Sequence, residues 1–333
     1  MKIIKKSLMS LLLTTASLVL LAACSRPEVK DVSKDKVTIN VVAPDGLPAM
    51  AMAKLIKENT QVDGYESMDI KYSVEKSSDA LVTAVLKKEP DIAIVPSNVA
   101  ATAYNKTKGE YKIAGTTGTG SFYLVSTEEL KKLEDIKGKT VVAMGKGLTP
   151  DLITQGLLKN MGVNGQTEVN FSYVNSPNEI IPIIATGKET TAIIPEPALT
   201  GLIATKPQVK VIASLNEQWM KIFNTTFGYP QATIIVKSEL LKEHKDFIEG
   251  FLSETEEGIK WDYNNKEEFG QYCEDIGLSA KKEVLIKSLE RSNLKYTGIK
   301  DSVEEYKNYF KILSELDAKT IGGQMPDEEI YMD

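Results

Sequence analysis

Short runs of β-branched residues alternate with helical stretches along most of this 333-residue chain. The run "VTINVVA" (37–43) precedes a helix expected over about 48–58, and "DIKYSVE" (69–75) precedes another over about 79–88. The runs "DIAIV" and "YKIAGTT" follow in the same way. Alternation of this kind predicts βαβ units around a mainly parallel sheet, and therefore an α/β fold.

The pattern repeats after about one hundred residues. A first "VVA" (41–43) precedes "GLP" (46–48) and a helical stretch, and a second "VVA" (141–143) precedes "GLTP" (147–150) and another. Farther along each half, "AIVP" and "AIIP" lead into helices rich in small residues, in the same order and at nearly the same offset. Each match is short and made of common residues, so chance is the alternative explanation. The shared order favours two lobes of like topology.

Two extended segments that contain glycine can carry the chain from one lobe to the other and back. They are "TTGTGSFYLVS" and "TFGYPQATIIVKS". From Glu239 onward the apolar residues recur every 3.6 positions, which predicts helices, two of them over about 282–291 and 301–316. The expected layout is lobe I at 37–120 plus 232–333, lobe II at 121–231, and hinge crossings near 117–126 and 226–236.

The first residues have the signature of an export signal. Three lysines precede an apolar run from Leu8 to Ala23, which is too short for a comfortable membrane span. The run ends in "LAAC" (21–24), which resembles the lipobox of bacterial lipoproteins. In that pattern the signal peptide, residues 1–23, is removed and Cys24 becomes the lipid-carrying N-terminus. The alternative is an ordinary signal peptide that happens to contain a cysteine.

Lipidation implies a location. A two-chain lipid anchors stably, so we expect the protein on the extracytoplasmic face of the cell membrane, anchored through Cys24, with residues 24–36 as a polar tether. Removal of residues 1–23 takes away three lysines and no acid. The mature chain then has 37 basic and 46 acidic residues, a net charge of −9, which argues against nucleic-acid binding. Cys273 alone remains as a free thiol, so the fold must depend on burial of its core rather than on disulfides.

The stretch "VVAMGKGLTPDL" (141–152) combines a strand, a glycine loop and a helix start, a shape that often binds phosphate. A dinucleotide fingerprint would need a third glycine where Pro150 stands, and a P-loop would need Gly-Lys-Ser/Thr at its end. We therefore expect no nucleotide and no other cofactor. The residues instead suit a helix start, with Thr149 as N-cap, Pro150 as first helical residue and Asp151 in the first turn.

Helix capping alone is one interpretation of this loop. The other is that the backbone N–H groups of Gly147, Leu148 and Thr149 bind the negative end of a ligand. A counterpart stands at Asp45-Gly46-Leu47-Pro48. Ligands of open α/β lobes bind outside the carboxyl ends of the strands, so two facing lobes would direct both helix starts at one cleft. This pairing favours the binding interpretation.

The chain resembles the solute-binding lipoproteins of bacterial ABC transporters, and among them the family that binds sulfonates, taurine, nitrate and thiamine-pyrimidine precursors. The likeness covers about residues 37–331 and is carried by "APDGLPAMAMAKL", "DIAIVPSNVA", "TTGTGSFYLVS", "LEDIKGKTVVAMGKGLTPDL", "IIATGKETTAIIPEPALTGLI" and "FGYPQATIIVKSELLKEHKDFIEGFL". It implies a type II periplasmic binding protein fold, in which two Rossmann-like α/β lobes are joined by two crossing strands and close by hinge bending. It also implies a small-molecule ligand and an ABC permease with its ATPase as partners. We expect a monomer.

The resemblance also implies a binding site. The family's ligand contacts fall after the first strand of each lobe, after the "AIVP" and "AIIP" strands, and at the crossings. Backbone N–H groups at positions 46, 47, 148 and 149 would hold an anionic or electron-rich group. Carried over by position, the expected ligand-binding residues are Asp45, Gly46, Leu47, Ser97, Asn98, Thr117, Gly147, Leu148, Thr149, Glu196 and Tyr229.

Two acids in this set leave the chemistry of the ligand open. Asp45 and Glu196 are either solvated loop acids or cleft residues that favour a cation or an N–H donor. If they face the cleft, a zwitterion or a nitrogen heterocycle fits better than a simple sulfonate or nitrate. The expected solute is therefore small and anionic, zwitterionic or heterocyclic.

An enzyme that works in the cleft is the main alternative class. His244 is the only histidine and lies among lysines and acids in a helical stretch. Without a second histidine, neither a Ser-His-Asp relay nor a His-rich metal site can be formed, so we expect no catalytic residues and no metal. A surface adhesin or a sensory lipoprotein on the same fold is the other alternative, and the sequence does not separate it from transport.

Overall fold

A computed structural model describes residues 36–333 of the chain. The expected signal peptide (1–23), Cys24 and, apart from Lys36, the tether (24–36) lie outside the described residues. From residue 36 to the last residue, no helix is both long and apolar enough to cross a membrane. Residues 37–333 form a single unit that contains two β-sheets.

The first sheet has six strands in the order β11-β4-β10-β3-β1-β2. Strand β1 pairs in parallel with β2 and β3, whereas β10 is antiparallel to β3 and β4, and β11 is antiparallel to β4. We call the part of the molecule built on this sheet lobe I. Its strands are β1 (Val37–Pro44), β2 (Met68–Glu75), β3 (Ile92–Pro96), β4 (Tyr111–Thr119), β10 (Pro230–Lys237) and β11 (Leu294–Gly298).

The second sheet, which builds lobe II, has five strands in the order β7-β6-β8-β5-β9. Strand β6 pairs in parallel with β7 and β8, as β1 does with β2 and β3. Strand β5 is antiparallel to β8 and β9, as β10 is to β3 and β4. The internal repeat predicted from the sequence is thereby confirmed. The strands are β5 (Phe122–Ser126), β6 (Thr140–Met144), β7 (Asn170–Val174), β8 (Thr191–Pro195) and β9 (Lys210–Ser214).

Both sheets are mixed, which corrects the expectation of mainly parallel sheets. Each sheet contains one strand that begins just after the chain has crossed from the other lobe: β5 in the second sheet and β10 in the first. Strand β4 ends at Thr119 in the first sheet and β5 begins at Phe122 in the second. The chain returns between the end of helix α10 (Leu215–Phe223) and the start of β10 at Pro230. The incoming strands β5 and β10 lie antiparallel to their neighbours, so a purely parallel ladder cannot form.

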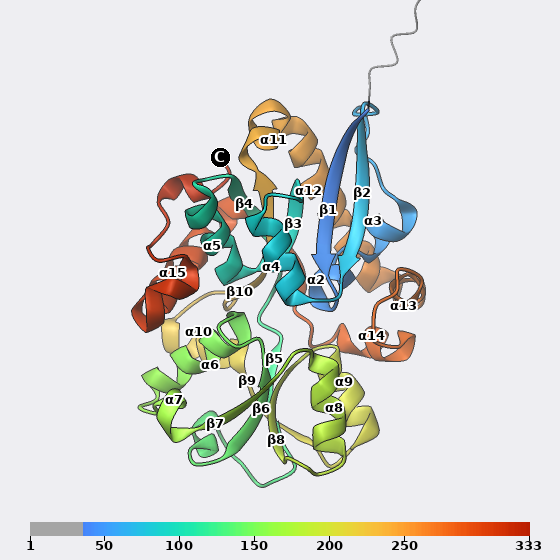
Figure 1. The fold of residues 1–333 in the computed structure, drawn as a ribbon. Coiled ribbons are helices and arrows are strands. Elements are labelled where there is room, and N and C mark those ends of the chain that lie inside the picture. Colours follow the sequence, from blue (N-terminus) through green and yellow to red (C-terminus); the bar gives the residue numbers. More distant parts are fainter. Residues whose placement is uncertain (1–35) are drawn as a thin grey trace, which may run out of the picture. The chain divides into compact units, whose positions relative to one another are not determined.

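Helices surround the two sheets (Figure 1). The helix expected over 48–58 is divided in two, because the N–H of Met52 bonds to the carbonyl of Ala49, three residues back, instead of continuing the α-helical pattern. Its two parts are α2 (Leu47–Met50) and α3 (Ala53–Glu58). Besides these and α10, the helices are α4 (Ser78–Leu86), α5 (Ser97–Thr107), α6 (Thr149–Asn160), α7 (Gly165–Glu168), α8 (Pro177–Ala185), α9 (Ala198–Thr205), α11 (Ser238–Glu243), α12 (Lys245–Asn264), α13 (Lys266–Asp275), α14 (Lys282–Ser288) and α15 (Val303–Asp317).

Two apolar cores hold these layers together. The larger one extends from lobe I into lobe II, and it includes Ile153 and Leu157 of α6 as well as Tyr309 of α15. Helices α6 and α15 pack against each other there. The smaller core lies under α8 and α9 of lobe II and includes Ile180 and Leu199. The two lobes therefore share a continuous core on the side of α6 and α15.

Candidate binding cavity

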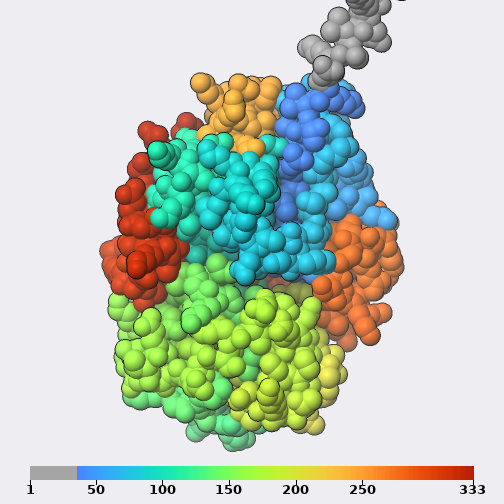
Figure 2. Space-filling model, viewed as in Figure 1, coloured from blue at the N-terminus to red at the C-terminus, as the bar shows by residue number. Residues whose placement is uncertain are grey.

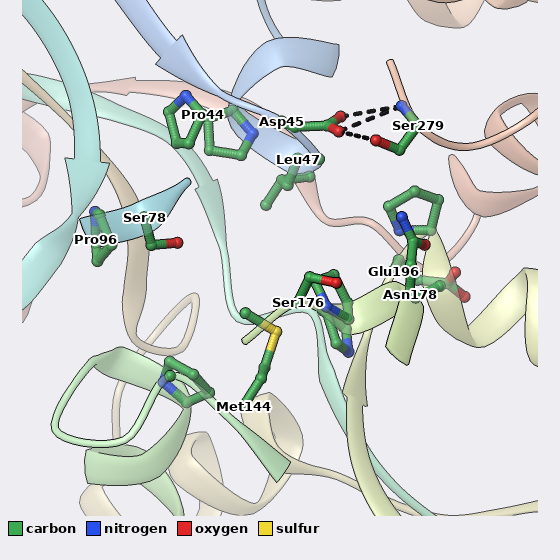
Figure 3. Close-up of a pocket in the computed structure, with 18 of the residues that line it drawn as sticks. Pro44, Asp45, Leu47, Ser78, Pro96, Met144, Ser176, Asn178, Glu196 and Ser279 are labelled. Carbon is green, nitrogen blue, oxygen red and sulfur yellow. Dashed lines mark hydrogen bonds between the residues drawn. The ribbon is translucent and has the colours of Figure 1, made fainter. Parts of the chain in front are cut away.

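A cavity of about 310 Å3 lies between the two sheets. Its walls come from segments that directly follow strands β1, β2 and β3 of lobe I and β6, β7 and β8 of lobe II. Leu47 and Met144 extend into this space from opposite lobes (Figure 3). The cavity thus lies outside the carboxyl ends of the strands, where open α/β lobes bind their ligands.

Four helices of eight or more residues begin among the residues that line the cavity. They are α4, α6, α8 and α9, and their first residues are Ser78, Thr149, Pro177 and Ala198. The first N–H groups of a helix have no partner inside the helix, and they carry a partial positive charge. Their convergence makes this region of the cavity suited to a negative or electron-rich group.

Three backbone N–H groups at these strand–helix junctions are free to bind a ligand. Within residues 36–333, no hydrogen-bond acceptor is found for the N–H of Gly46, Leu47 or Thr149. The sequence predicted free amides at these positions. It also predicted one at Leu148, and that prediction is wrong, because the Leu148 N–H donates to the carbonyl of Gly145 at 2.8 Å.

The glycine loop before α6 differs from the expected cap in two further ways. The N-cap is Leu148 rather than Thr149, and Thr149 is the first helical residue. The Gly147 N–H, also expected to be free, donates to Oδ2 of Asp151 at 2.8 Å, so the first-turn acid closes the loop itself. The side chain of Thr149, released from capping, bonds to Tyr309 Oη at 3.0 Å.

Asp45 lines the cavity, but its carboxylate is directed at the neighbouring loop (Figure 3). It accepts hydrogen bonds from the backbone N–H and the hydroxyl of Ser279. Lys76 Nζ lies 3.0 Å from its Oδ2. The negative charge of Asp45 is therefore balanced within the chain.

Glu196 lines the cavity as Asp45 and Glu75 do, and its side chain is fully buried. Its Oε1 accepts from Arg291 Nε at 2.6 Å and from the hydroxyl of Thr200 at 3.0 Å, and its Oε2 accepts from the Thr200 N–H at 3.0 Å. Burial raises the pKa of the Glu196 carboxyl, and the bonds from Arg291 and Thr200 oppose that rise. A cationic ligand group would have to compete with Arg291 for this carboxylate.

Four expected site residues lie behind the cavity wall and not on it. Ser97 Oγ bonds to Thr233 Oγ1 at 2.7 Å, and Asn98 Nδ2 donates to the carbonyl of Gly147 at 3.2 Å. Thr117 and Tyr229 are fully buried in the crossing region. Gly147 itself lines a separate groove of about 960 Å3 between α6 and β7 of lobe II and the end of α15. The structure brings Asp45, Gly46, Leu47, Leu148, Thr149 and Glu196 together around the cavity.

Several lining residues were not identified from the sequence. Ser176 and Asn178 stand at the start of α8, where the stretch "NSPN" after a strand carries the same Ser/Pro helix-start signal as the glycine loop. That signal could have been used. Ser279 and Leu285 come from a distant helical segment, and no local pattern marks them. An apolar surface completes the cavity, and it is formed by Leu47, Phe122, Met144, Leu148, Leu278 and Leu285.

Neither the only histidine nor a metal-ligand group is found in the described part of the cavity wall. His244 lies between α11 and α12 and does not line the cavity. Within residues 36–333, no three His, Cys, Asp or Glu side chains are grouped so that they could hold a metal ion. What the cavity offers a ligand is free N–H groups, hydroxyl and amide side chains, and an apolar wall.

Comparison with protein families matches most of the chain. The family described as "ABC transporter, phosphonate, periplasmic substrate-binding protein" matches residues 51–271. The comparison with curated proteins found no match.

Solved structures share the fold over most of the chain. An ABC transporter protein of Parabacteroides distasonis is similar with a TM-score of 0.76 and 23% identity, over 90% of this chain and 99% of that one. The periplasmic aliphatic sulphonate-binding protein SsuA of Escherichia coli has a TM-score of 0.69 and 14% identity, over 89% and 92%. The periplasmic nitrate-binding protein NrtA of Synechocystis PCC 6803 has a TM-score of 0.59 and 12% identity, over 76% and 70%. At these identities the likeness concerns the fold alone.

Proposed function

Because the chain belongs to the family of periplasmic substrate-binding proteins of phosphonate ABC transporters, we propose that it captures a small solute between its lobes and delivers it to a membrane permease. The permease and its ATPase are the partners that this role requires. The binding protein works as a monomer outside the cytoplasm, anchored through a lipid on Cys24.

We propose that the solute is a small organic anion with an oxyanion head. The observation that carries this proposal is the set of free N–H groups at Gly46, Leu47 and Thr149 on the cavity wall. Of the three acids in the lining, Asp45 and Glu196 are paired with Lys76 and Arg291, and the Glu75 carboxylate accepts a hydrogen bond from the Ser77 N–H. The premise for a zwitterion or a heterocycle was that Asp45 and Glu196 face the cleft without partners, and the ion pairs of these two acids with Lys76 and Arg291 remove that premise. The apolar wall supports a ligand with a carbon body.

The layout of lobes expected from the sequence becomes part of the proposal. Lobe I would comprise 37–120 plus 232–333 and lobe II 121–231, with hinges near 117–126 and 226–236. The two short connections between the sheets support hinges at these places, since they join the lobes by single stretches of chain.

A pair of matched variants tests the charge preference of the cavity. Ser176→Glu adds a carboxylate to the lining, whereas Ser172→Glu adds one on the exposed part of β7, away from the cavity. Two like charges about 4 Å apart repel by roughly 1–4 kcal/mol. We expect Ser176→Glu to weaken binding of an anionic probe by about tenfold or more, and Ser172→Glu to leave it unchanged.

The measurement is titration calorimetry with methylphosphonate, ethanesulfonate and nitrate, after mass spectrometry of any ligand that copurifies with the protein. Tighter binding of an organic anion than of nitrate would support the carbon body as well as the head. Equal affinity of both glutamate variants for the probes, or a copurified ligand that is a cation, would overturn the anion proposal.

A further inference from the structure

A segment near the end of the chain, Gly277–Asn293, leaves α13 of lobe I, passes along the cavity to contact lobe II and returns to β11 of lobe I, and we call it the strap. Its first end is held by lobe I. The Ser279 N–H and hydroxyl both donate to Asp45, and Lys76 Nζ donates to the carbonyl of Gly277. Both contacts lie where β1 and β2 end.

Near Arg291, the strap is held by lobe II. Arg291 Nε lies 2.6 Å from Glu196 Oε1, and its Nη2 donates to Thr200 Oγ1 at 2.8 Å. Tyr123 Oη of β5 donates to the carbonyl of Arg291 at 2.7 Å. After Arg291 the strap returns to lobe I, where Asn293 leads into β11 and its Nδ2 donates to the carbonyl of Gly120 at the crossing at 2.6 Å. All of these contacts are polar.

Between its two ends, the strap forms a wall of the cavity. Leu278, Ser279 and Leu285 line the cavity, and α14 packs between α13 of lobe I and α9 of lobe II. The contact with α13 is close, because a Cβ atom on Gly270 would lie 2.8 Å from Ile286. The contact with α9 is looser, with Val284 3.8 Å from the corresponding position on Gly201. Figure 2 shows the orange residues of this region beside the yellow-green surface of α8 and α9.

The opposite flank of the cavity is joined in a different way. There α6 of lobe II packs on α15 through the larger apolar core, and Thr149 bonds to Asn98 and Tyr309 in a buried cluster. Separation of the lobes on that side would expose apolar surface, at about 25 cal/mol for each Å2. On the strap side, the contacts that would break are the polar ones of Arg291 and Tyr123 and the loose packing of α14 on α9, and the Arg291 side chain is already 36% exposed.

We propose that the strap is the gate of the cavity, and that Arg291 and Glu196 are positioning residues that hold it closed over the solute. The gate stays attached to lobe I through Asp45 and opens where Arg291 leaves Glu196. The inference rests on the proposed capture of a solute, but the gate is defined by contacts of the chain itself. Asp45 and Glu196 then affect affinity without touching the ligand.

The test measures hydrogen–deuterium exchange, without added ligand, in the variants Arg291→Gln and Glu196→Gln. Lys287→Gln is the control. Lys287 is exposed on α14 and has no ion pair among the described residues, so the control removes the same charge from the same segment. A charge-assisted hydrogen bond contributes about 1.5–3 kcal/mol, so we expect amide exchange in 196–200 and 289–293 to rise by about tenfold or more in both test variants. Exchange in α6 and α15 should stay as in the wild type.

Glu196→Gln separates a gate from a merely structural contact. It removes a buried charge and keeps an oxygen that can accept from the Thr200 N–H, and the Arg291 side chain that loses its partner is already 36% exposed to water. The melting temperature should therefore change little while local exchange rises. Unchanged exchange in both segments, or a rise spread evenly through the body, would overturn the gate.

Stopped-flow release of methylphosphonate distinguishes the gate from the proposed function. Faster release in both test variants, with an unchanged association rate in the control, supports the gate. If no probe binds but local exchange rises as expected, the proposed ligand class fails and the gate stands. If the probe binds and its release rate is the same in all variants, the gate fails and the proposed function stands.

Discussion

At the scale of single residues, Asp262 is a carboxylic acid inside the apolar core. It lies in α12 with no exposed surface, and neither of its Oδ atoms has a hydrogen-bond partner among the described residues. Burial raises the pKa of this carboxyl well above its usual value of about 3.9, with Lys54 acting in the opposite direction. The folded chain therefore keeps this proton over a pH range in which the unfolded chain has lost it.

We expect Asp262→Asn to stabilise the fold at neutral pH. The unfolded acid ionises above about pH 4, so the wild-type free energy of unfolding falls as pH rises from there toward the folded-state pKa. Asparagine does not titrate, so the difference in the free energy of unfolding should grow with pH above about pH 4. Urea unfolding between about pH 4 and pH 8 measures it. Glu249→Gln, an exposed change on the same helix, should show no such trend, and parallel pH curves for Asp262→Asn and the wild type would contradict the argument.

At the scale of elements, two glycines inside helices meet their neighbours at different distances. A Cβ atom on Gly156 of α6 would lie 3.4 Å from Ile312 of α15, which is ordinary contact. A Cβ atom on Gly258 of α12 would lie 2.6 Å from Leu55 of α3, where the buried leucine has little room to move. The first helix pair tolerates a methyl group, and the second depends on its absence.

Gly156→Ala and Gly258→Ala should therefore change stability in opposite directions. Alanine in a helix interior is favoured over glycine by about 0.5–1 kcal/mol, so we expect Gly156→Ala to raise the free energy of unfolding by about that amount. At Gly258 the added methyl group overpacks the contact with Leu55. This should outweigh the helix-propensity gain and lower the free energy of unfolding by about 1–3 kcal/mol. Thermal melts of the two variants are compared, and each variant serves as the control for the other. If both melting temperatures shifted in the same direction, the contacts between the helices would not explain the effect of the substitutions.

At the scale of the whole molecule, the export signal and lipid anchor are testable in the producing cell. Cys24→Ala removes the only acceptor in the proposed lipid site. We expect the variant to leave the membrane fraction and to lose incorporation of labelled palmitate, since no other anchor is proposed for the chain. Fractionation followed by immunoblotting measures this, with Cys273→Ala as the matched cysteine control. Retention of Cys24→Ala in the membrane would contradict lipid anchoring.

Local patterns predicted much of the fold. β-branched runs marked strands such as β1 and β6, and Pro and Gly marked the helix starts, because these signals act within a few residues. The mixed sheets were not predicted, since β5 and β10 are placed by the path of the chain between lobes. The true partners of the two acids were also missed. Asp45 and Ser279 are 234 positions apart, and Glu196 and Arg291 are 95 apart, so neither local periodicity nor capping could pair them.

The position of the strap in the sequence determines when the cavity wall can be completed. Its residues stand in the last fifth of the sequence, yet they wall a cavity whose first contributors stand near position 45. An exported chain threads through the membrane from its N-terminus, so nearly all of it must emerge before this wall can be built. A solute can then be enclosed only after the strap, one of the last parts of the chain to emerge, has taken its place in the wall.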